Sequence, residues 1–484
     1  MYWIGYDIGS SSIKAALIHA DSGKIKKTVQ FPEKEMLINS PQPGWAEQEP
    51  SVWWKSVCMA THKLLNEADV DSANIKGIGI SYQMHGLVLV DKNYEVLRPS
   101  IIWCDSRAVA IGDELFRTCG EDRCVESLLN SPGNFTLSKL KWVKDNQPEL
   151  FEKVHKYMLP GDYIALKLTG VCSTTISGLS EGISWDFSQE RPADWLLEAA
   201  GISTDLIPDI FPTFSDQGKV NEQAAKETGL PEGIPVMYRA GDQPNNAVAL
   251  NVLNPGEIAA TGGTSGVVYA ITDAASTNEG QRINCFAHVN HSAEQTRIGK
   301  MLCINGTGIQ YSWMRSQVAK DVSYSELNEM ANAVKIGSDG LRILPFGNGA
   351  ERMLYNQNRG ARINNLNFNS HGKGHLLRAS LEGIAFGFVY GLEILKTDGV
   401  DLSSIKAGND NLFQAKLFSD TISTLTGSSI KIVETTGAVG AARAAALAHG
   451  DFVSLDEASA ADGVVGVYEP QTNKQAYIEA YELW

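Results

Sequence analysis

The chain has 484 residues, of which 43% are hydrophobic and 20% are charged, so two or three globular domains are expected and disorder is not. Its formal net charge of -15 argues against a nucleic-acid groove and against a polybasic membrane surface, because both need a basic footprint. A small metabolite is therefore the favoured partner.

The cysteines and the apolar segments indicate the compartment. The seven cysteines are scattered without CxxC pairs, which favours reduced thiols over a disulfide framework or a zinc cage. The sequence shows no charged and then apolar leader at its start, and no apolar run of membrane-spanning length. These features predict a cytoplasmic protein with no membrane partner.

The first predicted element is a hairpin within residues 2–17, YWIGYDIGSSSIKAAL. Alternating residues predict a strand, and Asp7, Gly9 and three serines follow at the bend. Glycine lets backbone N–H groups approach an anion, hydroxyls add donors, and Asp7 can hold a metal-bound water beside a polyphosphate. The chain has no GxxxxGK[ST] and no GxGxxG motif, so an ordinary hairpin with a polar bend stays open as an alternative.

Residues 51–90 predict a helix followed by two strands. Ser51 is expected to cap a helix whose apolar residues recur at helical spacing. A strand over 75–81 then ends at QMHG (83–86), and a second strand follows over 87–90. A polar, sulfur and imidazole cluster between two apolar strands is a place to meet a ligand, although such a cluster is more often a plain turn.

Two further polar segments follow. IIWCDSR (101–107) ends a strand with an aromatic ring, a carboxylate and a guanidinium, and an ion pair between Asp105 and Arg107 is the structural alternative to ligand binding. The polar loop TTISGLSEG (174–182) gives only a faint indication of function.

Residues 235–250, PVMYRAGDQPNNAVAL, predict a strand, then Asp242, then a helix with Pro244 in its first turn. Open α/β sheets place their chemistry at the carboxyl ends of strands, which makes Asp242 a candidate catalytic residue. A helix-capping role for this carboxylate is an equal alternative.

Residues 257–271, EIAATGGTSGVVYAI, repeat the pattern of strand, Gly/Thr/Ser turn and strand. Two such turns, roughly 250 residues apart, suggest two similar halves that face each other across a nucleotide. Later segments predict a strand-to-helix turn at IKAGND (405–410) and a small-residue helix over 437–447. That helix suits packing under a nucleotide-binding sheet, or plain helix packing.

In this order the motifs resemble those of the FGGY carbohydrate kinases of the actin-like ATPase superfamily, and within that family those of the xylulokinases. The similarity runs from DIGSSSIKAAL through PGWAEQEPSVWW, QMHG, IIWCDSR, AGDQ, GGTSG, LPFGNGAER and RASLEGIAFG to GAVGAAR. QMHG is the discriminating motif, because glycerol kinases carry Arg-Glu in its middle positions.

The resemblance implies an α/β fold of two ribonuclease-H-like domains with an interdomain cleft: a sugar-binding domain at 1–248 and a nucleotide-binding domain at 249–484. It implies ATP-dependent phosphorylation of a sugar primary hydroxyl with Mg²⁺, with D-xylulose as the first expectation. The alternatives are another FGGY kinase, acting on a ribulose, gluconate or a polyol, and a sugar-sensing protein that has lost turnover. A homodimer is left open.

The same resemblance implies the site residues. Asp242 would be the catalytic base. The sugar pocket would contain Met84, His85, Trp103, Asp105 and Gln243. ATP would be held by Asp7, Gly9, Ser10, Ser11, Ser12, Lys14, Gly263, Thr264, Ser265, Gly408 and Asn409, with Asp7 also arranging the Mg²⁺.

Three positions depart from the family pattern. Gln243 stands where many xylulokinases have Asn, which bears on the choice of sugar. The adenosine motif, usually Gly-Gly-Gly-Ala-Arg, is KAGND (406–410), which bears on the choice of nucleotide. ARINNL (361–366) lacks a glycine usual in the family signature, so its loop is expected to differ in shape.

Overall fold

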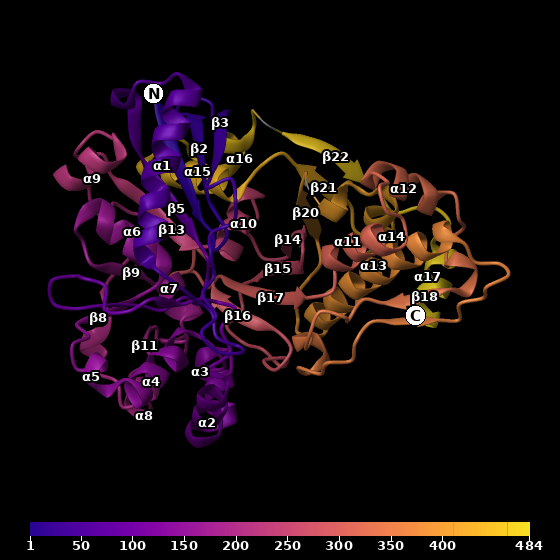
Figure 1. Cartoon of the computed structure of the whole chain (residues 1–484), viewed down its shortest axis with the longest axis horizontal. Coiled ribbons are helices and arrows are strands. Elements are labelled where there is room, and N and C mark those ends of the chain that lie inside the picture. Colours follow the sequence, from indigo (N-terminus) through magenta and orange to yellow (C-terminus); the bar gives the residue numbers. More distant parts are fainter. Residues whose placement is uncertain (410, 462) are drawn as a thin grey trace.

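The computed structural model describes residues 1–409, 411–461 and 463–484, and forms two lobes, each built around a β-sheet (Figure 1). The first sheet has five strands in the order β13-β5-β1-β2-β3. β1 pairs antiparallel with β2 and parallel with β5, and β5 pairs parallel with β13. Its strands are β1 (Tyr2–Ile8), β2 (Ile13–His19), β3 (Ile25–Phe31), β5 (Ile75–Tyr82) and β13 (Val236–Gly241).

The second sheet has seven strands in the order β16-β17-β15-β14-β20-β21-β22. β14 pairs antiparallel with β15 and parallel with β20, and β20 pairs parallel with β21, so the core of this sheet repeats the order and directions of the first. The expectation of two similar halves is therefore confirmed. The strands are β14 (Glu257–Gly262), β15 (Gly266–Thr272), β16 (Asn284–Ala287), β17 (Ile298–Ile304), β20 (Ser404–Gly408), β21 (Ile430–Val433) and β22 (Val464–Tyr468).

Short strands form five two-stranded sheets among the described residues. Four of them pair segments of the first half, and the fifth pairs β18 with β19 in the second half. They are β4 (Glu47–Gln48), β6 (Val88–Val90), β7 (Ser100–Ile101), β8 (Lys156–Met158), β9 (Ser173–Thr175), β10 (Trp185–Asp186), β11 (Arg191–Pro192), β12 (Asp209–Phe211), β18 (Arg342–Leu344) and β19 (Arg362–Asn364).

Helix α1 (Pro50–Ala68) covers the first sheet, and it corrects one expectation. Ser51 does not cap this helix: Glu49 is the N-cap residue, and Pro50 is the first helical residue. Proline is favoured there because its fixed φ suits the first turn and its missing N–H would have no helical partner. Trp53 and Val57 are fully buried, as the apolar spacing predicts.

The other helices of the first half surround the first sheet and the loops beyond its ends (Figure 1). No helix among the described residues is long and apolar enough to cross a membrane. The helices are α2 (Val109–Cys119), α3 (Glu121–Leu128), α4 (Thr136–Asn146), α5 (Pro148–Phe151), α6 (Pro160–Thr169), α7 (Ile176–Glu181), α8 (Asp194–Ala199), α9 (Glu222–Thr228) and α10 (Asp242–Ala249). Those of the second half are α11 (Gly308–Gln317), α12 (Tyr324–Asn332), α13 (Lys373–Thr397), α14 (Lys416–Thr426), α15 (Gly437–His449), α16 (Leu455–Ser459) and α17 (Lys474–Leu483).

Helix α15 comes late in the chain but packs on the first sheet, among strands from the N-terminal end (Figure 1). A Cβ on Gly5 would overlap the backbone oxygen of Ala438, and one on Gly79 would overlap that of Ala441. Strand glycines and helix alanines thus let the two backbones touch. The helix predicted over 437–447 is confirmed, and it crosses the domain boundary expected from the sequence.

Candidate active site

Three parallel strands of the first sheet end at the same edge and bring the candidate catalytic residues together. Asp7 lies near the end of β1 and pairs in register with Ser81 of β5, and the end of β5 pairs with the end of β13 at Gly241. Asp242 is the first residue of α10, directly after β13. Residues from distant parts of the chain therefore meet at the carboxyl edge, where open α/β sheets bind their ligands.

Asp7 and Asp242 interact electrostatically. Burial raises the pKa of Asp242 to about 7, and the negative charge of Asp7 adds to this effect. Burial also raises the pKa of Asp7, against the opposing effects of the Lys14 ammonium and of the Ser81 hydroxyl, which donates to Oδ1 at 3.1 Å. A carboxylate that titrates near neutral pH suits general-base chemistry.

The turn after Asp7 is held by its own backbone and by the side chain of Gln48. The N–H of Gly9 donates to the Ser12 carbonyl at 3.1 Å, and Gln48 Nε2 donates to the Ser10 carbonyl at 2.6 Å. Ser11 and Lys14 are exposed, whereas Ser12 is buried. The turn is thus fixed in shape, with its first serines free to meet an anion.

His85 lies in the turn after β5 with a φ of 62°, and its ring is anchored on one side. Its Nδ1 lies 2.9 Å from the Glu181 carbonyl oxygen, which can only accept, so Nδ1 carries the proton. Burial lowers the pKa of His85 to about 3, so the ring is neutral and its Nε2 is an acceptor for a hydroxyl group. The ring packs against Phe135 and Phe286.

Lys139, which the sequence did not single out, joins the two loops expected to hold the sugar. It is fully buried, and its Nζ donates to the His85 carbonyl at 2.8 Å and to the Ile102 carbonyl at 3.2 Å. Burial lowers its pKa to about 7. The sequence gives no local signal for this role, because both partners are backbone atoms of distant segments.

Trp103 and Asp105 have different environments. Trp103 is 53% exposed, and its indole N–H donates to Ser10 Oγ at 3.3 Å, which links the predicted sugar loop to the first phosphate turn. Asp105 is buried, forms an ion pair with Arg107 at 2.7 Å and accepts from the Ala46 N–H at 2.6 Å. The ion pair considered from the sequence is therefore present, and Asp105 fixes the loop that carries Trp103.

Met84 and Gln243 flank this site. Met84 is buried, and its Cγ lies against Gly241. Gln243 is half-buried and hydrogen-bonds the Asp242 carboxyl, which partly opposes the rise in the pKa of Asp242. Gln243 thus contacts the predicted base itself.

The second Gly/Thr/Ser turn joins β14 to β15, and it borders a cavity. Thr307 Oγ1 donates to the carbonyls of Gly263 and Thr264 at 3.0 and 3.1 Å, and the Gly308 N–H at the start of α11 also donates to Gly263. Ser265 is half-buried beside them. The cavity has a volume of about 460 Å³ and is lined by Gly262, Gly263, Thr264, Gly308, Ile309, Tyr311, Ser312, Tyr324, Asn328, Leu412, Gln414 and Ala415.

Gly408 and Asn409 lie at the end of β20, next to this cavity. Gln414 lines the cavity and donates to the Asn409 carbonyl at 3.0 Å. Asn409 is exposed, and its side chain donates to Glu434 at 2.6 Å. Asp410, the last residue of the altered adenosine motif, lies outside the described residues. On this side the cavity is lined by Leu412, Gln414 and Ala415, which the sequence did not indicate.

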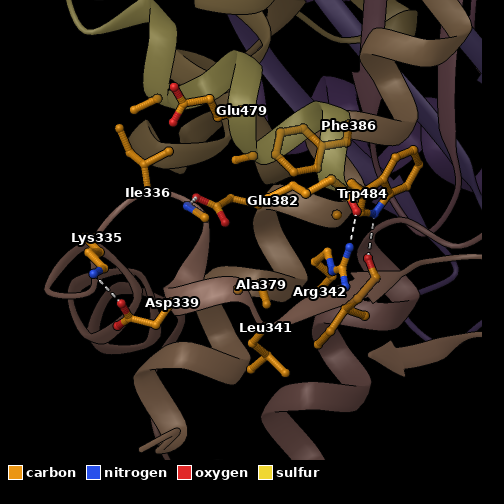
Figure 2. Close-up of a pocket in the computed structure, with 17 residues that line it drawn as sticks. Lys335, Ile336, Asp339, Leu341, Arg342, Ala379, Glu382, Phe386, Glu479 and Trp484 are labelled. Carbon is orange, nitrogen blue, oxygen red and sulfur yellow. Dashed lines mark hydrogen bonds and ion pairs between the residues drawn. The ribbon is translucent and has the colours of Figure 1, made fainter. Parts of the chain in front are cut away.

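A second cavity, of about 390 Å³, lies between α13 and α17 and contains no residue of either turn (Figure 2). Glu382 in its wall is buried, forms an ion pair with Arg378 at 2.7 Å and accepts from the Gly337 N–H at 3.0 Å. These bonds hold the loop before β18 against α13. This cavity is therefore not part of the candidate active site.

A divalent cation fits the edge that carries Asp7 and Asp242. No group of three or more His, Cys, Asp or Glu side chains within the described ranges could hold a metal. Mg²⁺ is usually held by one or two carboxylates together with substrate phosphates. Two neighbouring carboxyls, one of which raises the pKa of the other, match that donor set.

Comparison with known proteins gives a consistent result along the whole chain. The N-terminal domain model of the FGGY family of carbohydrate kinases matches residues 2–249, and the C-terminal domain model matches residues 258–449. The xylulose kinase of Bacillus subtilis (strain 168) is 29% identical over 499 residues, which cover 100% of this chain and 96% of the relative.

Solved structures agree with this result. The xylulose kinase from Rhodospirillum rubrum superposes with a TM-score of 0.88 at 25% identity, over 100% of this chain and 97% of that one. The gluconate kinase from Lactobacillus acidophilus gives a TM-score of 0.89 at 22% identity, over 100% and 96%, and supports the fold alone. The two-domain actin-like fold expected from the sequence is thereby confirmed.

Proposed function

Because the chain belongs to the FGGY family of carbohydrate kinases, and so is an ATP-dependent sugar kinase, we propose that it phosphorylates a primary hydroxyl of D-xylulose. One observation carries the proposal: Asp242, with a pKa of about 7, lies at the same sheet edge as Asp7 and the turn that holds His85. The names of the relatives support xylulose as the sugar.

In this proposal Asp242 accepts the proton of the sugar hydroxyl as its oxygen attacks the γ-phosphate of ATP. Phosphoryl transfer depends on positioning and on charge neutralisation more than on covalent chemistry, since its transition state is loose. His85 Nε2 accepts a hydrogen bond from a second sugar hydroxyl, while Met84, Trp103 and Gln243 enclose the sugar. Asp105 supports the Trp103 loop through its ion pair with Arg107.

The phosphates are held by the two turns. Backbone N–H groups and hydroxyls of Gly9, Ser10, Ser11 and Ser12, with Lys14 near them, meet one side, and those of Gly263, Thr264 and Ser265 meet the other. Gly408 and Asn409 support the adenosine at the edge of the 460 Å³ cavity. Asp7, with Asp242 beside it, would hold Mg²⁺, whose charge offsets that of the phosphate oxygens.

Another FGGY kinase activity is the second candidate. Gln243 stands beside the base in place of the Asn common in xylulokinases, which favours a sugar other than xylulose. A sugar sensor without turnover would also share the fold. Its only support is the altered adenosine motif, whereas Asp7, Asp242 and both turns match those of an active kinase.

A screen of purified protein with coupled ADP detection tests the proposal. D-xylulose, D-ribulose, gluconate and polyols are compared by kcat/KM, and D-xylulose is expected to be highest. Asp242→Ala is expected to remove sugar phosphorylation while sugar binding by calorimetry persists. A higher kcat/KM for another sugar would replace xylulose, and substantial turnover by Asp242→Ala would refute the assigned base.

A further inference from the structure

Glu181, the last residue of α7, is a buried carboxyl that the mechanism above does not use. It is 1% exposed, and neither carboxylate oxygen makes a well-formed hydrogen bond within the described part of the chain. The Tyr82 hydroxyl and the backbone N–H of His85 lie near it and favour its charged form only weakly. A buried polar group left in this state calls for an explanation, since such groups cost stability.

Helix α7 holds Glu181 firmly in place. Thr175 Oγ1 accepts from the Gly178 N–H at 3.0 Å at the start of this helix. Ser177 Oγ donates to the Ala287 carbonyl at 3.1 Å, and Ser180 Oγ accepts from the Ala287 N–H at 2.9 Å. The helix is therefore bonded to strand β16 of the second sheet, so the position of Glu181 is imposed by its surroundings.

Glu181 contacts both the predicted sugar turn and the strand that carries the base. Its carbonyl accepts from His85 Nδ1 at 2.9 Å. Its side chain lies against Gly241, where a Cβ would overlap Oε2. Gly241 directly precedes Asp242. Glu181 therefore lies between the His85 ring, which meets the sugar in the proposed function, and the Asp242 carboxyl, which takes the proton.

We propose that Glu181 is a positioning residue for phosphoryl transfer, which sets the spacing between His85 and Asp242. The inference rests on the proposed function. It accounts for one of the two contacts that require glycine at position 241, because a Cβ there would overlap Glu181 Oε2 as well as Met84 Cγ. It also gives a role to the polar segment 174–182, whose function the sequence left open.

The groups around Glu181 shift the pKa of its carboxyl. Burial raises its pKa well above the ordinary value, and the carboxylates of Asp242 and Asp162 raise it further. The cation nearest to Asp162 is Arg239, which forms an ion pair with it at 3.0 Å. The titratable groups that interact with Glu181 are Asp242, Asp162, Tyr82, Tyr269 and Lys139, and the Lys139 ammonium is already bound to two backbone carbonyls.

The test compares Glu181→Ala with the isosteric Glu181→Gln. Loss of the Glu181 carboxyl group in Glu181→Ala is expected to raise KM for the sugar at least 10-fold and to lower kcat. KM for ATP is expected to stay within 2-fold of the wild-type value. Glu181→Gln, which keeps the shape of the side chain, is expected to recover at least 5-fold of the kcat/KM that Glu181→Ala loses.

Ser177→Ala is the matched control, because it removes a hydrogen bond of the same helix without contact to His85 or Gly241. It is expected to leave the ratio of the two KM values unchanged. Equal rises in both KM values in Glu181→Ala would reduce Glu181 to a structural role. Failure of Glu181→Gln to recover kcat/KM would show that the shape of this side chain does not set the spacing, and would overturn the proposal.

A second pair of variants serves if Glu181→Ala does not fold. Gly241→Ala forces a methyl group against Glu181 Oε2 and Met84 Cγ and is expected to raise KM for the sugar. The double variant Gly241→Ala with Glu181→Ala removes the first of these overlaps and is expected to lower this KM in part. Failure of the double variant to improve on Gly241→Ala would overturn the inference. If Asp242→Ala is inactive and Glu181→Ala has wild-type kcat and KM, only the role of Glu181 is refuted. If Asp242→Ala is active, the proposed function is refuted.

Discussion

Asp242→Asn should make the protein more stable and inactive, with a pH dependence that identifies the cause. The pKa of Asp242 rises from an ordinary 3.8 to about 7 in the folded protein, mainly because burial disfavours the charged form. At ~1.4 kcal/mol for each pKa unit, ionising this carboxyl costs the folded state up to about 4 kcal/mol. Asparagine cannot ionise, so the variant avoids this cost.

The sign of the effect follows from proton binding. The folded wild type holds the proton of Asp242 more tightly than the unfolded chain, so its free energy of unfolding falls as pH rises from about 4 to 7 and is then level. The stability advantage of Asp242→Asn should therefore be up to about 4 kcal/mol at pH 8 and below about 2 kcal/mol at pH 5. Any difference in hydrogen bonding between Asn and protonated Asp is the same at both pH values.

Urea unfolding at pH 5 and pH 8 measures these differences, with turnover assayed on the same samples. Asp21→Asn, in an exposed turn, is the control for loss of one negative charge. An advantage of Asp242→Asn that does not change with pH would show that the folded protein does not raise the pKa of Asp242. The argument for Asp242 as a base poised near neutral pH would then fail.

Three further predictions test other parts of the site and fold. His85→Ala should raise KM for the sugar at least 10-fold with KM for ATP within 2-fold, and equal rises in steady-state assays would assign His85 to folding. Arg107→Met leaves the buried Asp105 carboxylate without its ion-pair partner and should cost roughly 3–5 kcal/mol in urea unfolding, whereas a loss below ~1 kcal/mol would show that this pair is dispensable. Gly5→Ala would drive a Cβ into the Ala438 oxygen and should cost about 1–3 kcal/mol or more, and unchanged thermal unfolding would mean that α15 is free to shift.

The sequence predicts best the features that depend on neighbouring residues. The hairpin of β1 and β2, with Asp7 at its bend, follows from alternation and from turn chemistry within one segment. The start of α10 follows in the same way from a strand, Asp242 and Pro244 in succession. The cap of α1 differs from the expectation because Ser51 and Pro50 are both helix-start signals, and the proline, one residue earlier, begins the helix.

The sequence does not predict the groups whose role depends on distant partners. Lys139 bonds to the carbonyls of His85 and Ile102, and every residue has a carbonyl, so no pattern of side chains reveals these contacts. Glu181 lies in a segment of small polar residues, and its proximity to Gly241 exists only after β13 joins the first sheet. Such residues stand out in the folded protein as buried polar groups with few partners.

The two halves of the sequence do not coincide with the two lobes. Backbone contact at Gly5 and Gly79 leaves α15 no room to slide, so this helix must move with the first sheet. Strand β16 of the second sheet is bonded to α7 of the first half, since Ser177 and Ser180 bond to Ala287. Asp7 and Asp242 both lie at one edge of the first sheet, whereas the turn at 263–265 belongs to the second sheet. We expect closure of the lobes to bring the phosphate to the sugar, with bending where the chain passes between the sheets: at 250–256, at 434–436 and between α16 and β22.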